Sequence, residues 1–103
     1  MGYIADMLII SKPPLIGFWT KHPDAEPPLR AWLRVMQDRN FKDLNDLKAT
    51  FGAADYVKPH TVFDISGNKY RLIAEIHYNT HKVFVRNVLT HAEYDTDKWK
   101  EKK

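Results

Sequence analysis

The sequence predicts a single α+β domain in which a helical hairpin covers one face of an antiparallel β-sheet. The chain has 103 residues, of which 44% are hydrophobic, and this fits one globular domain over residues 1–103. Apolar residues recur at helical spacing in residues 13–51, whereas they alternate with polar residues after Pro59. These two patterns predict the order strand, helix, helix, strand, strand, strand, followed by a short C-terminal helix.

The first elements are a short strand and two helices separated by a proline. Residues 7–10 form an apolar run that predicts a strand, and residues 1–6 are expected to be a loose extension. Ser11 is expected to cap the first helix, which ends at His22 because a residue before proline avoids the helical conformation. Asp24 is expected to cap the second helix. That helix carries an apolar stripe formed by Leu29, Trp32, Leu33 and Met36.

A short third helix and three strands complete the predicted fold. Asp43 is expected to cap the helix, whose apolar residues follow at helical spacing. The strands are predicted at 61–65, 70–77 and 82–90, and a Gly-Asn pair marks the first of the two turns between them. Residues 92–100 are expected to form a short helix or arm, with a basic, solvated and frayed end.

The two turns fix the expected register of the strands. Asp64 then lies opposite Arg71, and Ile73 lies opposite Arg86. Because side chains alternate along a strand, one face is apolar and is expected to contact the helices. That face collects Phe63, Ile65, Tyr70, Leu72, Ala74, Ile76, Val83, Val85 and Leu89. The opposite face is mixed and collects His60, Val62, Asp64, Arg71, Ile73, Glu75, His77, Phe84, Arg86 and Val88.

Two arginines on the mixed face, Arg71 and Arg86, are candidate phosphate ligands. A guanidinium group binds phosphate through two parallel hydrogen bonds and stays charged at any relevant pH. The same pattern is open to cross-strand ion pairs, of Arg71 with Asp64 and of Arg86 with Glu75. The ion pairs are the commoner arrangement on a solvated sheet face, so the pattern alone leaves both interpretations open.

Candidate proton-transfer groups follow the last predicted strand. His91 and Tyr94 are three residues apart, so they share one side of the segment if it is helical. Histidine titrates near neutral pH, and tyrosine can donate a proton or stack on a base. A helix start with a packed tyrosine would show the same pattern, so this alternative also stays open.

Composition narrows the classes of function. The net charge of +3 and the pI of about 9.2 favour a polyanionic partner. The chain has no cysteine, which excludes disulfides, thiolate zinc sites and thiol catalysis. No pair of histidines has helical ligand spacing and no glycine-rich phosphate loop occurs, so neither a metal nor another cofactor is expected. The sequence shows neither a secretory signal nor a run long enough to span a membrane, so a cytoplasmic protein without membrane contact is expected.

Two segments resemble the HigB-type toxins of the RelE superfamily. Residues 62–74, VFDISGNKYRLIA, resemble the central hairpin of these toxins. Residues 83–95, VFVRNVLTHAEYD, resemble their C-terminal segment, in which Thr-His-x-Glu-Tyr-Asp is the recurring ending. The helical residues 18–23 and 29–32 are similar too, so the resemblance covers nearly the whole chain from Met7.

This resemblance implies a RelE-like fold and the toxin role in a type II toxin–antitoxin system. The implied activity is ribosome-dependent cleavage of mRNA in the ribosomal A site. The implied partners are translated mRNA and a HigA-type antitoxin with a helix-turn-helix domain. The toxin–antitoxin complex would repress its own operon, so operator DNA would be contacted only through the antitoxin complex.

The resemblance also implies roles for individual residues. Arg71 resembles the strand arginine that RelE relatives use on the scissile phosphate. His91 falls where many relatives place a second arginine, and Tyr94 lies near their C-terminal catalytic tyrosine. The arginine-to-histidine change leaves open which group is the general acid and which is the base. Lys58, Lys69 and Arg86 are the expected RNA-binding residues.

The implied chemistry is metal-independent, because the RNA 2′-OH attacks the adjacent phosphate and DNA lacks this group. Two other functions remain open from the sequence. The chain could be a non-catalytic RNA- or ribosome-binding module that blocks translation by occupancy. It could also be a structural or regulatory domain in which both arginines form ion pairs only.

Overall fold

The computed structural model describes residues 7–101, and the extension expected at residues 1–6 lies outside this range. The first half contains β1 (Leu8–Ile10), α1 (Pro13–Lys21), the 3₁₀ turn η1 (Pro23–Ala25), α2 (Glu26–Asp38) and α3 (Leu44–Thr50). The second half contains β2 (Asp55–Val57), β3 (His60–Ile65), β4 (Tyr70–His77), β5 (Lys82–Thr90), α4 (His91–Asp95) and the 3₁₀ turn η2 (Lys98–Glu101).

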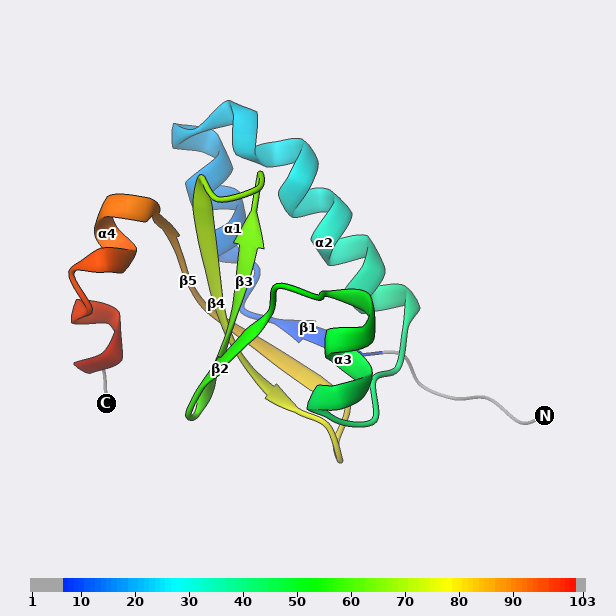
Figure 1. Cartoon of the computed structure of the whole chain (residues 1–103). Coiled ribbons are helices and arrows are strands. Elements are labelled where there is room, and N and C mark those ends of the chain that lie inside the picture. Colours follow the sequence, from blue (N-terminus) through cyan, green and yellow to red (C-terminus); the bar gives the residue numbers. More distant parts are fainter. Residues whose placement is uncertain (1–6, 102–103) are drawn as a thin grey trace.

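The sheet has five strands in the order β1-β5-β4-β3-β2 (Figure 1). The α+β class is confirmed, and the pairs β3–β4 and β4–β5 are antiparallel as expected. Two details differ from the prediction. β1 pairs with β5 in parallel, which makes the sheet mixed, and β2 is an additional edge strand. A strand of only three residues shows no alternation that a sequence pattern could reveal.

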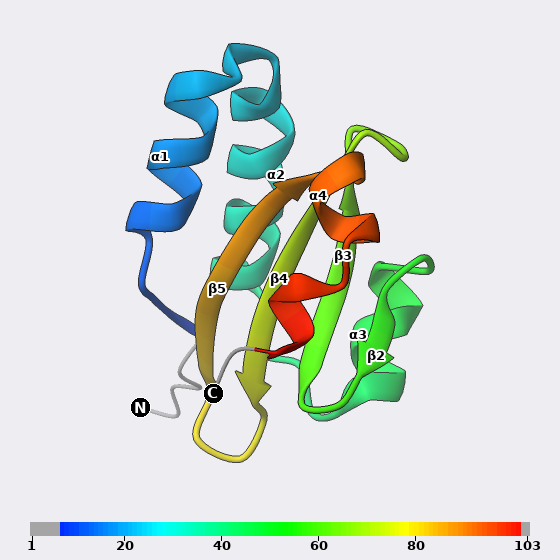
Figure 2. The ribbon, with the colours of Figure 1, turned by 90° about the vertical axis from the view of Figure 1, so that its left-hand side faces the viewer.

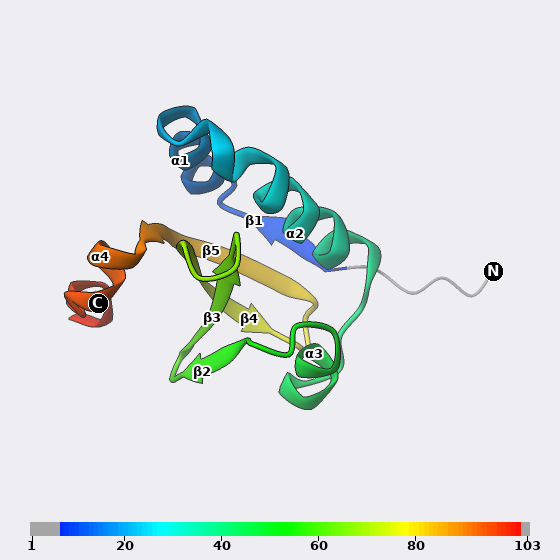
Figure 3. The ribbon, with the colours of Figure 1, turned by 45° about the horizontal axis from the view of Figure 1, so that its top comes forward.

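The helical hairpin of α1 and α2 covers one face of the sheet (Figure 3). The buried side chains on that side form one core, to which α3 contributes Leu47. Aromatic rings join its layers, because Trp32 of α2 and Phe51 after α3 both meet Phe63 edge to face, at 5.4 and 5.1 Å between ring centres. The predicted arrangement of helices on the apolar face is therefore confirmed.

The helix caps differ from the prediction at two of three positions. Asp43 caps α3 by accepting a hydrogen bond from the Asp46 backbone N–H at 2.9 Å, as expected. Ser11 does not cap α1, which begins after Lys12. Asp24 does not cap α2, because it lies in η1 and its carboxylate accepts hydrogen bonds from Tyr70 and Lys69 instead.

A β-bulge changes the register between β4 and β5. The pairs Asp64–Arg71 and Ile76–Val83 are those expected, but Ile73 lies opposite Asn87, where Arg86 was predicted. The bulge lies between the pairs of Ile73 and Ala74, and Arg86 is the extra residue on β5. A bulged strand keeps one additional residue out of the ladder, and this shifts the alternation of every residue that follows it.

The bulge therefore reverses the predicted positions of Val88 and Leu89. Val88 is buried in the main core, whereas Leu89 contacts a second cluster on the opposite face. That cluster consists of Val62, Ile73 and Trp99, and Figure 2 shows the C-terminal segment crossing this face of the sheet. The end of the chain was expected to be frayed and solvated, but Trp99 is only 5% exposed. No helix within residues 7–101 has the length and apolar character needed to cross a membrane.

Candidate active site

Arg71 lies on the face of the sheet opposite the helical hairpin and is almost fully buried. Its side chain is held by three kinds of partner. Nε lies 3.2 Å from the Asp64 carboxylate, Nη1 donates to the backbone oxygens of Asn68 and Tyr70 at 3.1 and 3.3 Å, and Nη2 donates to the Asn68 side chain. The ion pair with Asp64 that the strand register predicted is thus present. These contacts fix the guanidinium in one orientation.

Tyr94 covers the guanidinium of Arg71. The Arg71 Cζ atom lies 5.2 Å from the centre of the Tyr94 ring, a cation–π contact. On its other side Tyr94 stacks on Trp99, with ring centres 5.2 Å apart and an angle of 15° between the planes. The indole N–H of Trp99 donates to the Tyr94 backbone oxygen at 3.0 Å. Arg71 and Tyr94, two of the predicted catalytic residues, are therefore in contact.

His91 is the first residue of α4, and the start of this helix is well defined. Thr90 is the N-cap, and it exchanges two hydrogen bonds with Glu93 in a capping box. The His91 backbone N–H donates to the Lys69 oxygen at 3.2 Å, which ties α4 to the turn before β4. The imidazole is half exposed, and its Nε2 lies 3.3 Å from the Asp95 carboxylate. The helix or arm expected over residues 92–100 is thus a short helix, His91–Asp95, followed by the separate 3₁₀ turn Lys98–Glu101, and the packed tyrosine that the sequence pattern left open is present.

Arg86 lies apart from Arg71, because it is three residues along β5 from Leu89, the partner of Arg71, which is about 10 Å along the strand. Its Nη2 donates to Glu75 at 3.0 Å, so the second predicted ion pair is also present. Among the described residues, His77 is the other partner of Glu75, and its Nε2 lies 3.1 Å from the second carboxylate oxygen. The hydrogen bond from Arg86 is the main cause that holds the pKa of Glu75 below its ordinary value.

The two predicted RNA-binding lysines lie in different surroundings. Lys58 is exposed in the turn between β2 and β3. Lys69 is exposed as well, but its Nζ lies 2.5 Å from the Asp24 carboxylate. Asp24 also accepts from the Tyr70 hydroxyl at 2.9 Å. The hydrogen bonds from Lys69 and Tyr70 lower the pKa of Asp24, and Asp24 in turn raises the pKa of Lys69.

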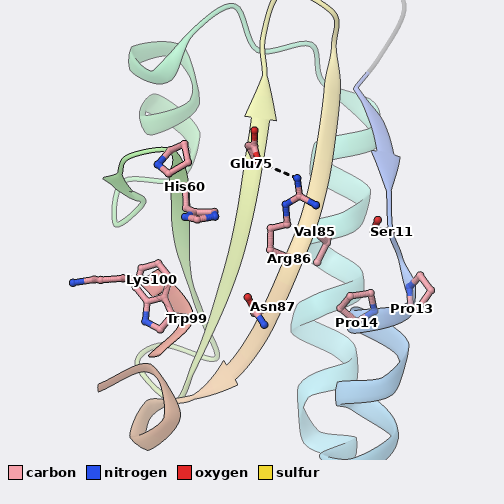
Figure 4. Close-up of a pocket in the computed structure, with 11 residues that line it drawn as sticks. Ser11, Pro13, Pro14, His60, Glu75, Val85, Arg86, Asn87, Trp99 and Lys100 are labelled. Atoms are coloured by element: carbon pink, nitrogen blue, oxygen red, sulfur yellow. Dashed lines mark hydrogen bonds and ion pairs between the residues drawn. The ribbon is translucent and has the colours of Figure 1, made fainter. Parts of the chain in front are cut away.

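The structure thus brings Arg71, Tyr94 and His91 to one end of the sheet and leaves Arg86 at a distance. Arg71 and Tyr94 are in contact, and His91 begins the helix that carries Tyr94 but directs its imidazole to Asp95. Arg86 lines a separate depression of about 660 Å³ (Figure 4). A fixed guanidinium beside a phenol can stabilise a developing negative charge, and a phenol or a half-exposed imidazole can transfer protons. Within residues 7–101, no group of three His, Asp or Glu side chains is placed to hold a metal ion.

Three contributing residues were not identified from the sequence. Trp99 stacks on Tyr94. A tryptophan near the lysine-rich end of the chain could have indicated that this end packs against the domain, since its large ring seldom stays fully solvated. Asn68, in the turn before β4, accepts a hydrogen bond from Arg71. In the sequence, an asparagine at this position was explained by the geometry of the turn alone. Asn87 faces outward only because of the bulge, which no sequence pattern indicated.

Comparison with known proteins identifies relatives over most of the chain. Residues 25–97 match the HigB toxin family, described as the RelE-like toxic component of a toxin-antitoxin system. The chain is 33% identical over 92 residues to the mRNA interferase toxin HigB of Escherichia coli strain K12, and the match covers 86% of this chain and 88% of that protein. The mRNA interferases HigB of Escherichia coli O157:H7 and Shigella flexneri match to the same extent.

The matched region contains both segments on which the resemblance was based, residues 62–74 and 83–95. It also contains α2 and the four strands β2 to β5, so most of the α+β architecture lies inside it. The chain belongs to the HigB toxin family, the RelE-like toxic components of toxin-antitoxin systems.

Proposed function

We propose that this chain is an endoribonuclease that cuts mRNA during translation on the ribosome. The observation that carries the proposal is the contact between Arg71 of β4 and Tyr94 of α4. It pairs a charge-stabilising group with a proton donor in a chain whose relatives are named mRNA interferases.

The proposed reaction uses the nucleophile that RNA itself carries, so it needs no metal. The 2′-OH loses its proton to a general base and its oxygen bonds to the adjacent phosphorus. The bond from phosphorus to the 5′ oxygen then breaks, and a general acid protonates the leaving oxygen. The products are a 2′,3′-cyclic phosphate and a 5′-OH, and DNA is not a substrate because it lacks the 2′-OH.

Three residues divide this work. Arg71 stabilises the extra charge on the phosphorane, and its hold by Asp64 and Asn68 preorganises it for this role. One such donor contributes about 10²–10³ in rate. His91 and Tyr94 transfer the two protons, and each transfer contributes about 10²–10⁴.

RNA binding involves a second set of residues, Lys58, Lys69 and Arg86. All three are exposed enough to reach phosphates of mRNA or of ribosomal RNA. Lys69 and Arg86 already have carboxylate partners, so phosphate must compete with Asp24 and Glu75 for them. Binding through such contacts weakens as the salt concentration rises.

The partners follow from the family. A toxin of this kind has an antitoxin, and we propose that it is a HigA-type protein with a helix-turn-helix domain. Operator DNA is contacted only through the complex of the two proteins. The toxin acts in the cytoplasm, where translated mRNA is found.

The proposal is tested by mapping mRNA ends after the chain is induced in bacteria. Primer extension on a reporter mRNA is expected to give discrete new 5′ ends, and these disappear when the reporter's start codon is removed. Arg71→Ala and His91→Gln are expected to abolish both the ends and the growth arrest. Arg34→Ala, on the exposed side of α2, is the matched control and stays toxic.

The second candidate is a non-catalytic module that blocks translation by occupancy. It is favoured by one observation, because Arg71 is 9% exposed and already bonded to the protein. In this case induction arrests growth without new mRNA ends, and RNA recovered from the arrested cells carries no new 2′,3′-cyclic phosphate ends. That result would reject the enzyme.

A further inference from the structure

The β-bulge in β5 turns two neighbouring polar side chains to the same face of the sheet. Residues that follow each other in a regular strand point to opposite faces, but Arg86 and Asn87 both face away from the helical hairpin (Figure 4). Bulges are common next to functional sites, where they redirect a side chain. Here the redirected residue is Asn87, which a regular strand would have turned towards the core.

Asn87 lies at the centre of a groove along β5. It lines three adjoining depressions, with volumes of about 660, 390 and 320 Å³. The first reaches Arg86 and His60, and the other two reach Glu93 in α4. The groove therefore leads from Arg86 to Glu93 of α4, the helix that also carries His91 and Tyr94, whereas Arg71 and Tyr94 line a separate depression of about 350 Å³.

The chemistry of the groove suits a single-stranded nucleic acid. Its rim is basic and carries Lys21, Arg86, Lys98 and Lys100. Both of its carboxylates are already bonded within the protein, Glu75 to Arg86 and Glu93 to the Thr90 backbone N–H. The flat side chains of His60 and Trp99 line one wall, and Pro13 and Pro14 line the other. Basic rims with planar side chains are typical of single-strand binding grooves.

We propose that this groove holds the nucleotides of RNA that flank the cleaved bond, with Arg86 on a phosphate and the Asn87 amide on the edge of a base. This assignment rests on the proposed function for the identity of its ligand. The phosphate contact falls to Arg86, because the prolines that begin α1 have no backbone N–H to offer an anion. An amide carries both a donor and an acceptor, so Asn87 can distinguish base edges that a lysine cannot.

A protein segment is the rival occupant. A helix that docks in a groove presents apolar side chains, and it prefers an apolar floor. The groove does contain apolar side chains, but Arg86, Asn87 and Lys100 lie among its lining residues, and these basic and polar groups suit an occupant that carries phosphates.

The test uses 2′-O-methyl trinucleotides of each of the four bases, which bind but cannot be cut by the 2′-OH reaction. In NMR titrations of the full chain, the side-chain amide of Asn87 and the indole N–H of Trp99 are expected to shift. One base is expected to bind about fivefold or more tightly than another. Asn87→Ala removes this preference, and Arg86→Gln weakens all four probes about tenfold.

Asn79→Ala and Arg34→Gln are the matched controls, since both residues are exposed and lie outside the groove. Spectra of each variant verify that it is folded. The proposal is overturned if Asn87→Ala keeps the base preference, or if the groove signals do not move with any trinucleotide, including the case in which purified antitoxin moves them and the trinucleotides do not. Because the probes are not cut, loss of cleavage in the mRNA assay would reject the proposed function without affecting this result.

Discussion

The carboxylate of Asp64 lies 3.2 Å from Nε of Arg71, so the arginine at the centre of the candidate site is also an ion-pair partner within the fold. If Arg71 serves only the stability of the fold, loss of the Asp64 carboxylate should destabilise the chain as much as loss of Arg71 does. If Arg71 binds phosphate, loss of Asp64 should leave cleavage largely intact. Without the Asp64 carboxylate, Arg71 keeps its hydrogen bonds to Asn68 and Tyr70. Its positive charge is then no longer neutralised by Asp64 and can interact with a ligand.

Arg71→Ala is expected to abolish cleavage and to destabilise the fold by about 1–3 kcal/mol, because it leaves buried acceptors without a donor. Asp64→Asn is expected to cost less than this, since Asp64 is more exposed than Arg71, and to keep cleavage within about tenfold of the unmodified chain. Urea unfolding gives the stability, and primer extension gives the cleavage. Equal destabilisation with full toxicity in both variants would show that the pair is structural only.

Tyr94 combines a chemical and a structural role, and two substitutions separate them. Tyr94→Phe keeps the ring between Arg71 and Trp99, so the unfolding midpoint should stay nearly unchanged while cleavage falls about 10²–10⁴-fold. Trp99→Ala removes a buried ring and should cost about 3 kcal/mol, near the low end for such a change because few residues surround Trp99.

Trp99→Phe is the control for that change, because it keeps a ring against Tyr94 and loses only the indole hydrogen bond. If Tyr94→Phe cleaves normally, the hydroxyl transfers no proton and His91 must be paired with another group.

The register of the sheet shows how far the sequence could predict this fold. The turn at Gly67 and Asn68 fixed the β3–β4 pairs, and all of them are found as expected. The β4–β5 pairs are correct near the turn and fail beyond Ala74, because a bulge depends on the packing of β5 against its neighbours. Alternation along a strand cannot reveal the residue at which the alternation stops.

The candidate site was predictable only in part for a similar reason. The ion pair of Arg71 with Asp64 follows from the register, and a helix or arm was expected after the last strand, where α4 is found. The packing of Trp99 against Ile73 could not be predicted, because it depends on the direction in which the chain turns after α4. Contacts between residues on different elements require the fold itself.

Val88 and Leu89 test the bulge directly. Val88→Ala is expected to cost about 2 kcal/mol, since it removes two methyl groups from the main core. Leu89→Ala removes more atoms but should cost only about 1 kcal/mol, because Leu89 is partly exposed at the smaller cluster. Urea unfolding gives the free energy of unfolding of both variants. A larger decrease for Leu89→Ala than for Val88→Ala would mean that β5 has the regular register without the bulge.

Asp24 gives the fold a dependence on pH. Hydrogen bonds from Lys69 and Tyr70 lower the pKa of Asp24 in the folded chain, so its contribution to stability is complete above the ordinary pKa of an aspartate, about 4. The contribution is lost as the pH falls through the lowered value. The raised pKa of Lys69 has the opposite sign, so that its contribution is lost at high pH, above about 10.4.

Asp24→Asn is therefore expected to lower the melting temperature at pH 7, and the difference from the unmodified chain should shrink below pH 4. Thermal melts at pH 7, 5 and 3 measure this, with Asp38→Asn at the exposed end of α2 as the control. The same contact bears on the candidate site, because Lys69 accepts the His91 N–H through its backbone oxygen. A variant that loses the Asp24 contact should thus also cleave more slowly at pH 7, and Asp24→Glu should recover part of both losses. A constant difference in melting temperature from pH 7 to pH 3 would mean that the charge of Asp24 stabilises nothing.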